Sequence, residues 1–164
     1  MNPLRKSYEA RVLVVPLGSD ALELAESLGD LGVDGVQVLS HPDAELASTE
    51  VLGQDGWEPP SPANTSQVTQ SADMIVLLAT DMSAVAEATV REVCAAAREG
   101  GDLIAAVLVS PQHWEEPSGA SAMVTLRQEV DMLISVRGPR LVAALLDVLR
   151  GGAREAATAE EVLV

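Results

Sequence analysis

Short apolar runs alternate along this chain with longer segments whose apolar residues recur every three or four positions. The runs at 12–15 and 75–78 consist of valine, leucine and isoleucine, which is typical of strands buried on both faces. The spacing of Leu22, Ala25 and Leu28 instead predicts one face of a helix. We therefore expect strands at 11–16, 36–40, 74–79, 103–109 and 132–136. We expect helices at 21–31, 83–98, 121–130 and 140–150, with a short helix at 43–52.

The order of these elements predicts the fold class. Strands that alternate with helices along a whole chain form a mostly parallel sheet with helices on both faces. We expect an α/β protein with a three-layer, Rossmann-like architecture, built as one domain at 11–150 with tails at 1–10 and 151–164. The segment 53–70 is rich in proline, glycine and serine and is long for a loop, so we expect it to be mobile or functional.

In such a sheet, ligands bind at the carboxyl ends of the strands. The loop after the first strand contains only one glycine, Gly18, and Ser19 or Asp20 can cap the next helix. The loop after the third strand, Thr-Asp-Met-Ser at 80–83, contains no glycine. A phosphate bound at a helix start needs free backbone N–H groups, so glycine dominates such loops. Asp81 would instead repel an anion, and we expect Asp81 and Ser83 to cap the following helix.

Four segments, taken in order, resemble the nucleotide-binding domain of FtsZ, the bacterial tubulin-like GTPase. They are "RVLVVPLGSDALELAESLGDLGVDGVQVLSHPDAEL", "SADMIVLLATDM", "AEATVREVCAAAREGGDLIAAVLVSP" and "LRQEVDMLISV" followed by "PRLV". The resemblance extends over 11–150 and implies the topology of the FtsZ/tubulin nucleotide-binding domain.

The nucleotide motifs of that family are not retained. The sequence at 83–89, Ser-Ala-Val-Ala-Glu-Ala-Thr, stands where the family has the glycine-rich GGGTGTG. Gly138 aligns with an asparagine near the guanine, and of an Asn-Thr-Asp after the second strand only Asp43 matches. The degenerate nucleotide-site positions are Gly18, Ser19, Asp20, Asp43, Asp81, Ser83 and Gly138. The resemblance therefore implies a pseudo-GTPase without catalytic residues or a cofactor.

Composition narrows the classes of partner. The 164 residues carry a formal net charge of −15, which opposes binding to nucleic acid or anionic lipid, because both are bound chiefly through Lys and Arg. No apolar run approaches the ~20 residues of a membrane-spanning helix, and the start of the chain lacks the apolar segment of a secretory signal. We expect a cytoplasmic protein. The single cysteine, Cys94, is expected to act as a small buried hydrophobe.

Two loop clusters offer metal ligands in sequence. His41 with Asp43, and His113 with Glu115 and Glu116, each combine an imidazole with carboxylates. Such neighbours in the loops of an acidic protein are typical of solvated side chains, so we expect no metal site. The pairs Ser40–His41 and Ser110–His113 suggest a nucleophile and a base only by their proximity in sequence.

Two alternative functions remain open at this point. One is an enzyme or enzyme subunit that binds a small molecule at the strand ends, with carboxylates from Asp20, Asp43, Asp81 and Asp131. The other is a structural subunit that assembles with copies of itself.

The last predicted helix favours contact between proteins. It is apolar on nearly every face, and such a helix needs cover on all sides. Trp114, in the loop 110–119, is a second candidate contact, because tryptophan often anchors interfaces. The candidate interaction residues are Trp114, Leu141, Leu145, Leu146 and Leu149. We expect a non-catalytic FtsZ-like domain that contacts itself, as a homodimer first, or a protein partner such as an FtsZ-type protein.

Overall fold

Six strands form one sheet in the computed structural model, which describes residues 9–54 and 56–151. The strands are β1 (Val12–Pro16), β2 (Val36–His41), β3 (Ser48–Leu52), β4 (Met74–Asp81), β5 (Leu103–Gln112) and β6 (Met132–Val136). Their order across the sheet is β3-β2-β1-β4-β5-β6, and only β3 runs antiparallel to its neighbour. Of the expected tails at 1–10 and 151–164, residues 1–8 and 152–164 lie outside the described residues.

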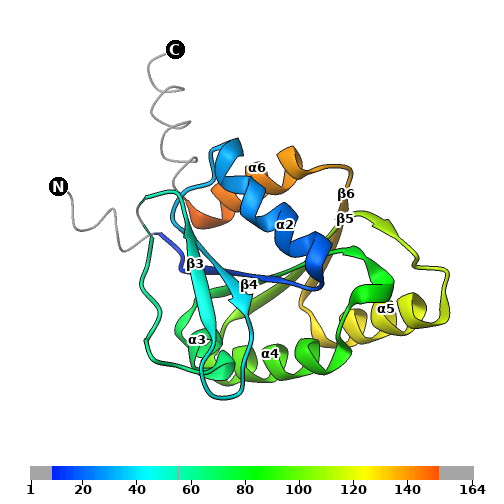
Figure 1. Ribbon diagram of the computed structural model, residues 1–164, viewed down its shortest axis with the longest axis horizontal. Coiled ribbons are helices and arrows are strands. Elements are labelled where there is room, and N and C mark those ends of the chain that lie inside the picture. The colour runs from blue at the N-terminus through cyan, green and yellow to red at the C-terminus, as the bar shows by residue number, and fades with distance from the viewer. Residues whose placement is uncertain (1–8, 55, 152–164) are drawn as a thin grey trace, which may run out of the picture.

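Helices cover both faces of the sheet, so the predicted three-layer, Rossmann-like α/β class is confirmed (Figure 1). The helices are α2 (Ser19–Ser27), η1 (Leu28–Leu31), α3 (Thr65–Ser71), η2 (Met82–Ala84), α4 (Glu87–Gly100), α5 (Pro117–Glu129) and α6 (Pro139–Arg150). One face carries α2, η1 and α6, and the other carries α3, α4 and α5. None of the helices in the described ranges combines the length and hydropathy needed to cross a bilayer.

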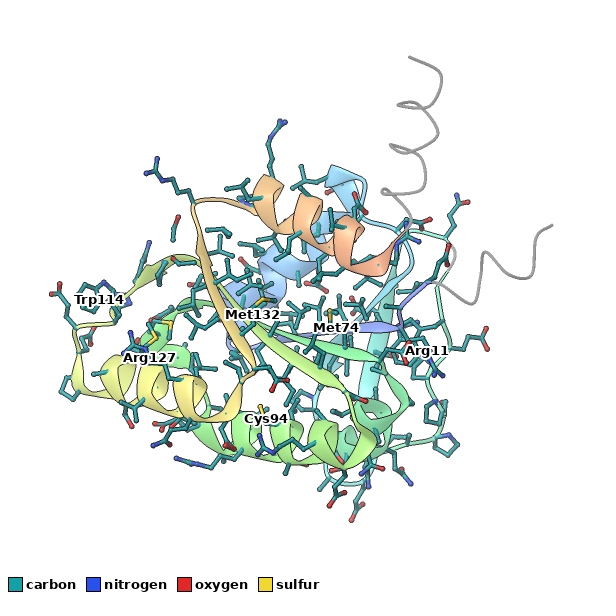
Figure 2. All side chains as sticks on the ribbon, turned by 180° about the vertical axis from the view of Figure 1, so that it is seen from behind. Arg11, Met74, Cys94, Trp114, Arg127 and Met132 are labelled. Atoms are coloured by element: carbon teal, nitrogen blue, oxygen red, sulfur yellow. The ribbon has the colours of Figure 1, made fainter. Side chains whose placement is uncertain are left out.

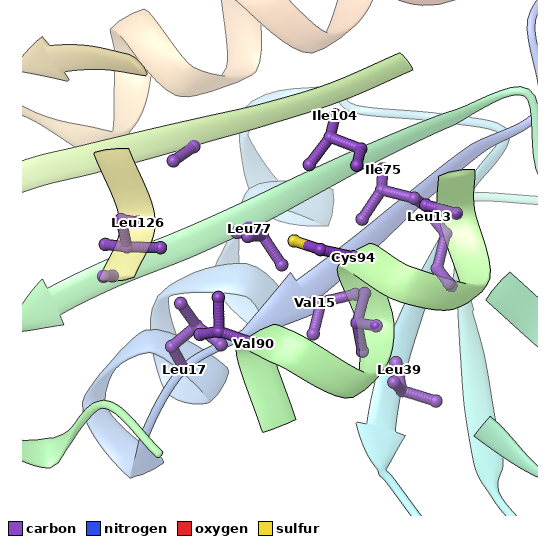
Figure 3. Close-up of a cluster of buried hydrophobic side chains, with 14 of the residues drawn as sticks. Leu13, Val15, Leu17, Leu39, Ile75, Leu77, Val90, Cys94, Ile104 and Leu126 are labelled. Carbon is purple, nitrogen blue, oxygen red and sulfur yellow. The ribbon is translucent and has the colours of Figure 1, made fainter. Parts of the chain in front are cut away.

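Two hydrophobic cores lie on either side of the sheet because successive strand residues point to opposite faces. In β1, Leu13 and Val15 pack toward α4, whereas Val12 and Val14 pack toward α2. The thiol of Cys94 is fully buried among side chains such as Leu77, as predicted for a small hydrophobe (Figure 3). Burial raises the pKa of this thiol to about 11, so it stays protonated and unreactive at neutral pH.

The helix predicted at 43–52 is wrong, because Ser48–Leu52 forms the antiparallel strand β3. Asp43 explains the reversal: its Oδ1 accepts hydrogen bonds from the backbone N–H groups of Glu45 and Leu46, at 2.7 and 2.8 Å. Such a turn, closed by an aspartate side chain, returns the chain alongside β2. The sheet therefore has one strand more than the sequence pattern predicts.

The predicted loop at 53–70 is also partly wrong, because it contains the start of α3. Asn64 and Gln67 form a reciprocal capping box, in which each side chain bonds the other residue's backbone N–H. Earlier in the segment, the indole N–H of Trp57 donates to the Val12 carbonyl at 3.0 Å, and the Trp57 carbonyl accepts from the Gln37 side chain. These bonds fasten the segment to the amino ends of β1 and β2.

One buried carboxyl follows α4. Asp102 is 8% exposed, and its Oδ2 has no hydrogen-bond partner among the described residues. Burial, followed by the nearby charge of Asp73, raises the pKa of Asp102 to about 6 from an ordinary value of 3.8. The folded state thus binds this proton more tightly than the unfolded state. The stabilising contribution is complete below pH 3.8 and is lost as the pH rises through about 6.

Replacement of this carboxyl should therefore stabilise the protein at neutral pH. For Asp102→Asn we expect a free energy of unfolding about 1–3 kcal/mol above wild type near pH 7.5, because each pKa unit is worth about 1.4 kcal/mol. The difference should vanish near pH 3, below the ordinary pKa of 3.8, where Asp102 is protonated in both states. Urea denaturation at the two pH values measures it. Glu92→Gln, on the exposed face of α4, is the matched control, and an equal gain there would refute the role of burial.

Candidate functional site

The strand order places a topological switch point between β1 and β4, because the chain winds outward from β1 in one direction and from β4 in the other. In open sheets of this kind, the crevice at the carboxyl ends of the two switch-point strands is the usual ligand site. The residues that meet there are those after Pro16 on β1 and those around Asp81 at the end of β4.

The chain narrows this crevice at Gly18. Gly18, the residue before α2, has φ +125°, and a Cβ built on it would lie only 3.1 Å from the Cβ of Ala84 in η2. Met82 in the same turn is fully buried. Ser19 and Asp20 lie within the exposed first turn of α2 and neither caps it, so that prediction is wrong. η2 thus lies against the residue before α2, while the first turn of the helix stays exposed.

Asp81 organises the end of β4. Its Oδ1 accepts three hydrogen bonds, from the Ser83 backbone N–H at 3.0 Å, the Ser83 hydroxyl at 2.6 Å and Nδ1 of His113 at 2.8 Å. These bonds lower the pKa of Asp81, chiefly through the Ser83 hydroxyl, and so keep it ionised. The predicted helix cap is only partly correct, because Asp81 caps the short turn η2. The helix α4 begins at Glu87 without a side-chain cap.

His113 links the loop after β5 to this carboxylate. Its ring is hydrogen-bonded to Asp81 on one side, and its Nε2 lies 3.8 Å from a Glu116 oxygen on the other. Its backbone has a φ of +58°, an uncommon conformation for a residue other than glycine. The hydrogen bond and the charge of Asp81 raise the pKa of His113. The Asp81–His113 ion pair, called the clamp below, therefore joins the end of β4 to the loop after β5.

The structure assembles neither of the serine–histidine pairs suggested by sequence. The Ser110 hydroxyl donates to the Arg137 carbonyl at 2.6 Å, and the Ser40 hydroxyl donates to the Ser48 carbonyl at 3.1 Å. Both hydroxyls are therefore bonded to main chain away from the imidazoles. Within residues 9–54 and 56–151, no three histidine, cysteine or acidic side chains converge as metal ligands.

The remaining candidates are dispersed. Asp43 closes the turn between β2 and β3, and Gly138 precedes α6 in an extended conformation with open space around it. Asp131 lies at the amino end of β6, where its Oδ2 accepts from the Ile104 N–H at 2.9 Å. Asp131 therefore does not meet Asp81, because it lies at the amino end of β6 and Asp81 at the carboxyl end of β4.

Sequence reasoning missed a cavity of about 920 Å³ at the amino ends of the strands. Arg11 and Asp73 line it and are joined by a two-pronged ion pair, with N–O distances of 3.3 and 3.4 Å. Arg150 lines it as well and lies 3.8 Å from Glu9. No local motif could indicate these pairs, because the partners come from distant parts of the chain. Arg11 and Arg150 thus each have a carboxylate within ion-pair distance, whereas the buried Nε of Arg150 has no hydrogen-bond partner among the described residues.

The predicted interaction residues on α6 divide between two environments. Leu146 is fully buried in the core, so it cannot contact a partner. Leu145 and Leu149 are half-buried against the same core. Leu141 is 53% exposed, and Val148, which the sequence reasoning did not single out, is 50% exposed two turns later. The outer face of α6 is therefore apolar and open to solvent.

Trp114 is likewise on the surface, with 53% of its area exposed. It projects from the loop between β5 and α5, at the opposite end of the molecule from Arg11 (Figure 2). The same view shows β6, with Met132, as the outermost strand on this side of the sheet.

No family model matches the chain, and no curated protein matches it.

The clamp predicts a pH dependence of stability. Because the pKa of His113 is raised, its contribution is complete below the ordinary value of 6.5 and is lost as the pH rises through the folded-state pKa. Because the pKa of Asp81 is lowered, its contribution requires a pH above 3.8. We therefore expect His113→Gln to lower the melting temperature near pH 5.5 more than near pH 8.5.

An NMR titration of the His113 ring tests the same clamp directly. In Asp81→Asn its pKa should fall from the wild-type value toward 6.5, because the accepting charge is removed. His41→Gln is the control for loss of an imidazole elsewhere and should leave the His113 titration unchanged. An unaltered His113 pKa in Asp81→Asn would contradict the ion pair.

Proposed function

We propose that this chain is a non-catalytic, FtsZ-like pseudo-GTPase domain that acts through protein–protein contact, by self-association or by binding a partner such as an FtsZ-type protein. The observation that carries the proposal is the outer face of α6, where Leu141 and Val148 are half-exposed. Fully burying a large apolar side chain contributes about 1.5–3 kcal/mol, so burying the exposed halves of these two contributes about 1.5–3 kcal/mol in total and favours association. The exposed Trp114 offers a second contact point.

The crevice at the switch point supports the non-catalytic part of the proposal. Ala84 of η2 lies against Gly18, directly before α2, and leaves little room there for a ligand. The negative charge of Asp81 also lies at this edge, where it opposes the approach of a phosphate. The FtsZ-like identity rests on the order of the sequence segments, and the strand order of the sheet is compatible with it.

An enzyme is the second candidate, and the Asp81–His113 pair favours it, because a carboxylate on Nδ1 orients many catalytic imidazoles. A general base also needs a group from which to take a proton. In the described residues, the hydroxyl nearest in sequence, Ser110, is bonded to Arg137 instead. The pair is therefore better suited to fastening loops than to catalysis.

Substitutions on α6 test the contact. For the double variant Leu141→Gln with Val148→Gln, we expect roughly tenfold to a hundredfold weaker association, because apolar contact area is lost. Light scattering measures self-association, and co-sedimentation with FtsZ polymers measures the partner version. The matched control, Leu46→Gln with Val124→Gln, replaces two exposed apolar residues outside α6 and should bind as wild type.

Equilibrium dialysis with labelled GTP tests the absence of nucleotide chemistry. We expect no binding and no turnover by the wild-type protein, because Ala84 lies against Gly18 and Asp81 places negative charge at this end of the sheet. Tight GTP binding with turnover would overturn the proposal. A protein that neither self-associates nor co-sediments with FtsZ polymers would overturn the contact function.

A further inference from the structure

The edge strand β6 presents unpaired backbone groups to solvent. In β5, the N–H of Leu103 donates to the Asp73 carbonyl beside β4. The backbone of Ile104 faces β6 instead: its N–H donates to Oδ2 of Asp131, and its carbonyl accepts from the Asp131 N–H. Because backbone direction alternates along a strand, Ala106 and Leu108 also face β6. These two residues lie opposite Leu133 and Ser135, and in a parallel ladder a residue bonds the neighbours of its opposite residue.

It follows that Met132, Ile134 and Val136 bond to β5, while the N–H and C=O groups of Leu133 and Ser135 point away from the sheet. No partner for these outward groups exists within the described part of the chain. Proteins normally protect such an edge with charge, proline or a bulge. β6 contains none of these, since its sequence is Met-Leu-Ile-Ser-Val and its pairing with β5 is regular.

The opposite edge is protected. β3 carries the exposed Glu50, and its pairing with β2 contains an irregularity between Leu39 and His41. The chain after β3 also lies against this strand, because a Cβ built on Gly56 would lie 2.6 Å from a Val51 methyl group. The two edges therefore differ in chemistry, and only β6 is suited to accept another strand.

The sequence around β6 is complementary to itself. Asp131 stands immediately before the strand and Arg137 immediately after it, so the two charges are placed symmetrically about Ile134. When two copies run antiparallel with their Ile134 residues opposite, Asp131 of each copy faces Arg137 of the other. Arg137 has no ion-pair partner among the described residues. Asp131 uses Oδ2 for the Ile104 N–H and retains Oδ1.

The same register also gives the outward backbone N–H and C=O groups of β6 their hydrogen-bond partners. Leu133 of each copy lies opposite Ser135 of the other, so the outward groups of both residues are paired. A shift by two residues in either direction would move Asp131 away from Arg137. Opposite charges directly across two strands contribute about 0.2–1 kcal/mol each, and this selects one register.

We infer that β6 pairs antiparallel with β6 of a second copy about a two-fold axis at Ile134, which joins the two sheets into one. This inference rests on the proposed function and specifies its self-associating form. Met132, at 36% exposure, then lies opposite Val136 of the other copy, on the sheet face that carries α6.

The outer face of α6 extends this contact. α6 packs over β5, and in the pair the two β5 strands lie about 14 Å apart, three strand spacings of about 4.8 Å. Helices above these strands are about 14 Å apart, wider than the about 8–10 Å of directly packed helices. The strand pairing therefore carries the inferred contact, and Leu141 and Val148 are the exposed apolar side chains of α6 nearest to hand for enlarging it toward the about 800 Å² per partner of a standard interface.

Cross-linking tests the pairing directly. In this register Ile134 meets its own copy in a non-hydrogen-bonded pair with Cα atoms about 4.5 Å apart, within disulfide range. We expect Ile134→Cys to form a covalent dimer on mild oxidation, because the native Cys94 is fully buried and does not compete. Val124→Cys, an exposed position on α5, is the matched control and should remain monomeric on a denaturing gel.

Two pairs of variants test the mode of contact by sedimentation equilibrium. Ser135→Pro removes an outward N–H without removing a bond to β5, and should weaken the dimer at least tenfold. Ser135→Ala keeps that N–H and should dimerise as wild type. Arg137→Glu places like charges opposite each other and should weaken the dimer. Arg140→Glu, outside the ladder, should not.

The outcomes separate the two proposals. A wild-type dimer in which Ile134→Cys fails to cross-link, or which survives both Ser135→Pro and Arg137→Glu, overturns β6 pairing and leaves contact through α6 as the proposed function. A wild-type monomer that co-sediments with FtsZ polymers also overturns β6 pairing alone. If Ser135→Pro fails to fold by circular dichroism, the cross-linking result decides.

Discussion

Burial on both sides of β1, β4 and β5 is the constraint on which the rest of this structure depends. Val14, Val76 and Val107 are fully buried on one face, and their neighbours Leu13, Leu77 and Ala106 are fully buried on the other. A strand with no solvent-facing side needs helices above and below, and its backbone must be paired on both edges. The parallel order and the two helical layers follow from this requirement. Within the sheet, the strand ends and the outer edges of β3 and β6 are the parts without a neighbouring strand.

The two ends of the sheet differ in which groups lie there and how those groups are bonded. At the carboxyl ends, the polar groups bond one another: Asp81 accepts hydrogen bonds from Ser83 and His113. Ala84 lies in close contact with Gly18 at the same end. At the amino ends, Arg11 and Asp73 neutralise each other beside the cavity. Charges at both ends are thus largely internally satisfied. By contrast, α6 exposes Leu141 and Val148, and the outer edge of β6 has no neighbouring strand. The proposed contact function rests on these two features.

Local patterns in the sequence were sufficient for the central elements and insufficient for the site. β6 has the predicted bounds, and β4, β5 and α6 differ from prediction only at their ends, because long apolar runs and helical spacing are local signals. β3 was missed because its short sequence has little apolar character and depends on β2 for its pairing.

Contacts between distant residues were not predictable in the same way. His113 and Asp81 are separated by 32 positions, and neither residue type requires the other. The apolar character of α6 was recognised, but its division into faces was not, since Leu146 is buried while Leu141 is exposed. That division depends on where the helix lies on the sheet, which the spacing of its leucines does not specify.

The reversed direction of β3 determines how loops are allotted between the two ends of the sheet. A parallel β3 would finish beside the carboxyl end of β2, and the next connection would start there. Because β3 runs back, Leu52 lies opposite Val36, at the amino end of β2. The chain then continues to α3, and on the way the Trp57 indole donates a hydrogen bond to the Val12 carbonyl. The orientation of β3 therefore removes one connection from the carboxyl ends of the strands. It places that connection at the amino ends, where it lines the cavity.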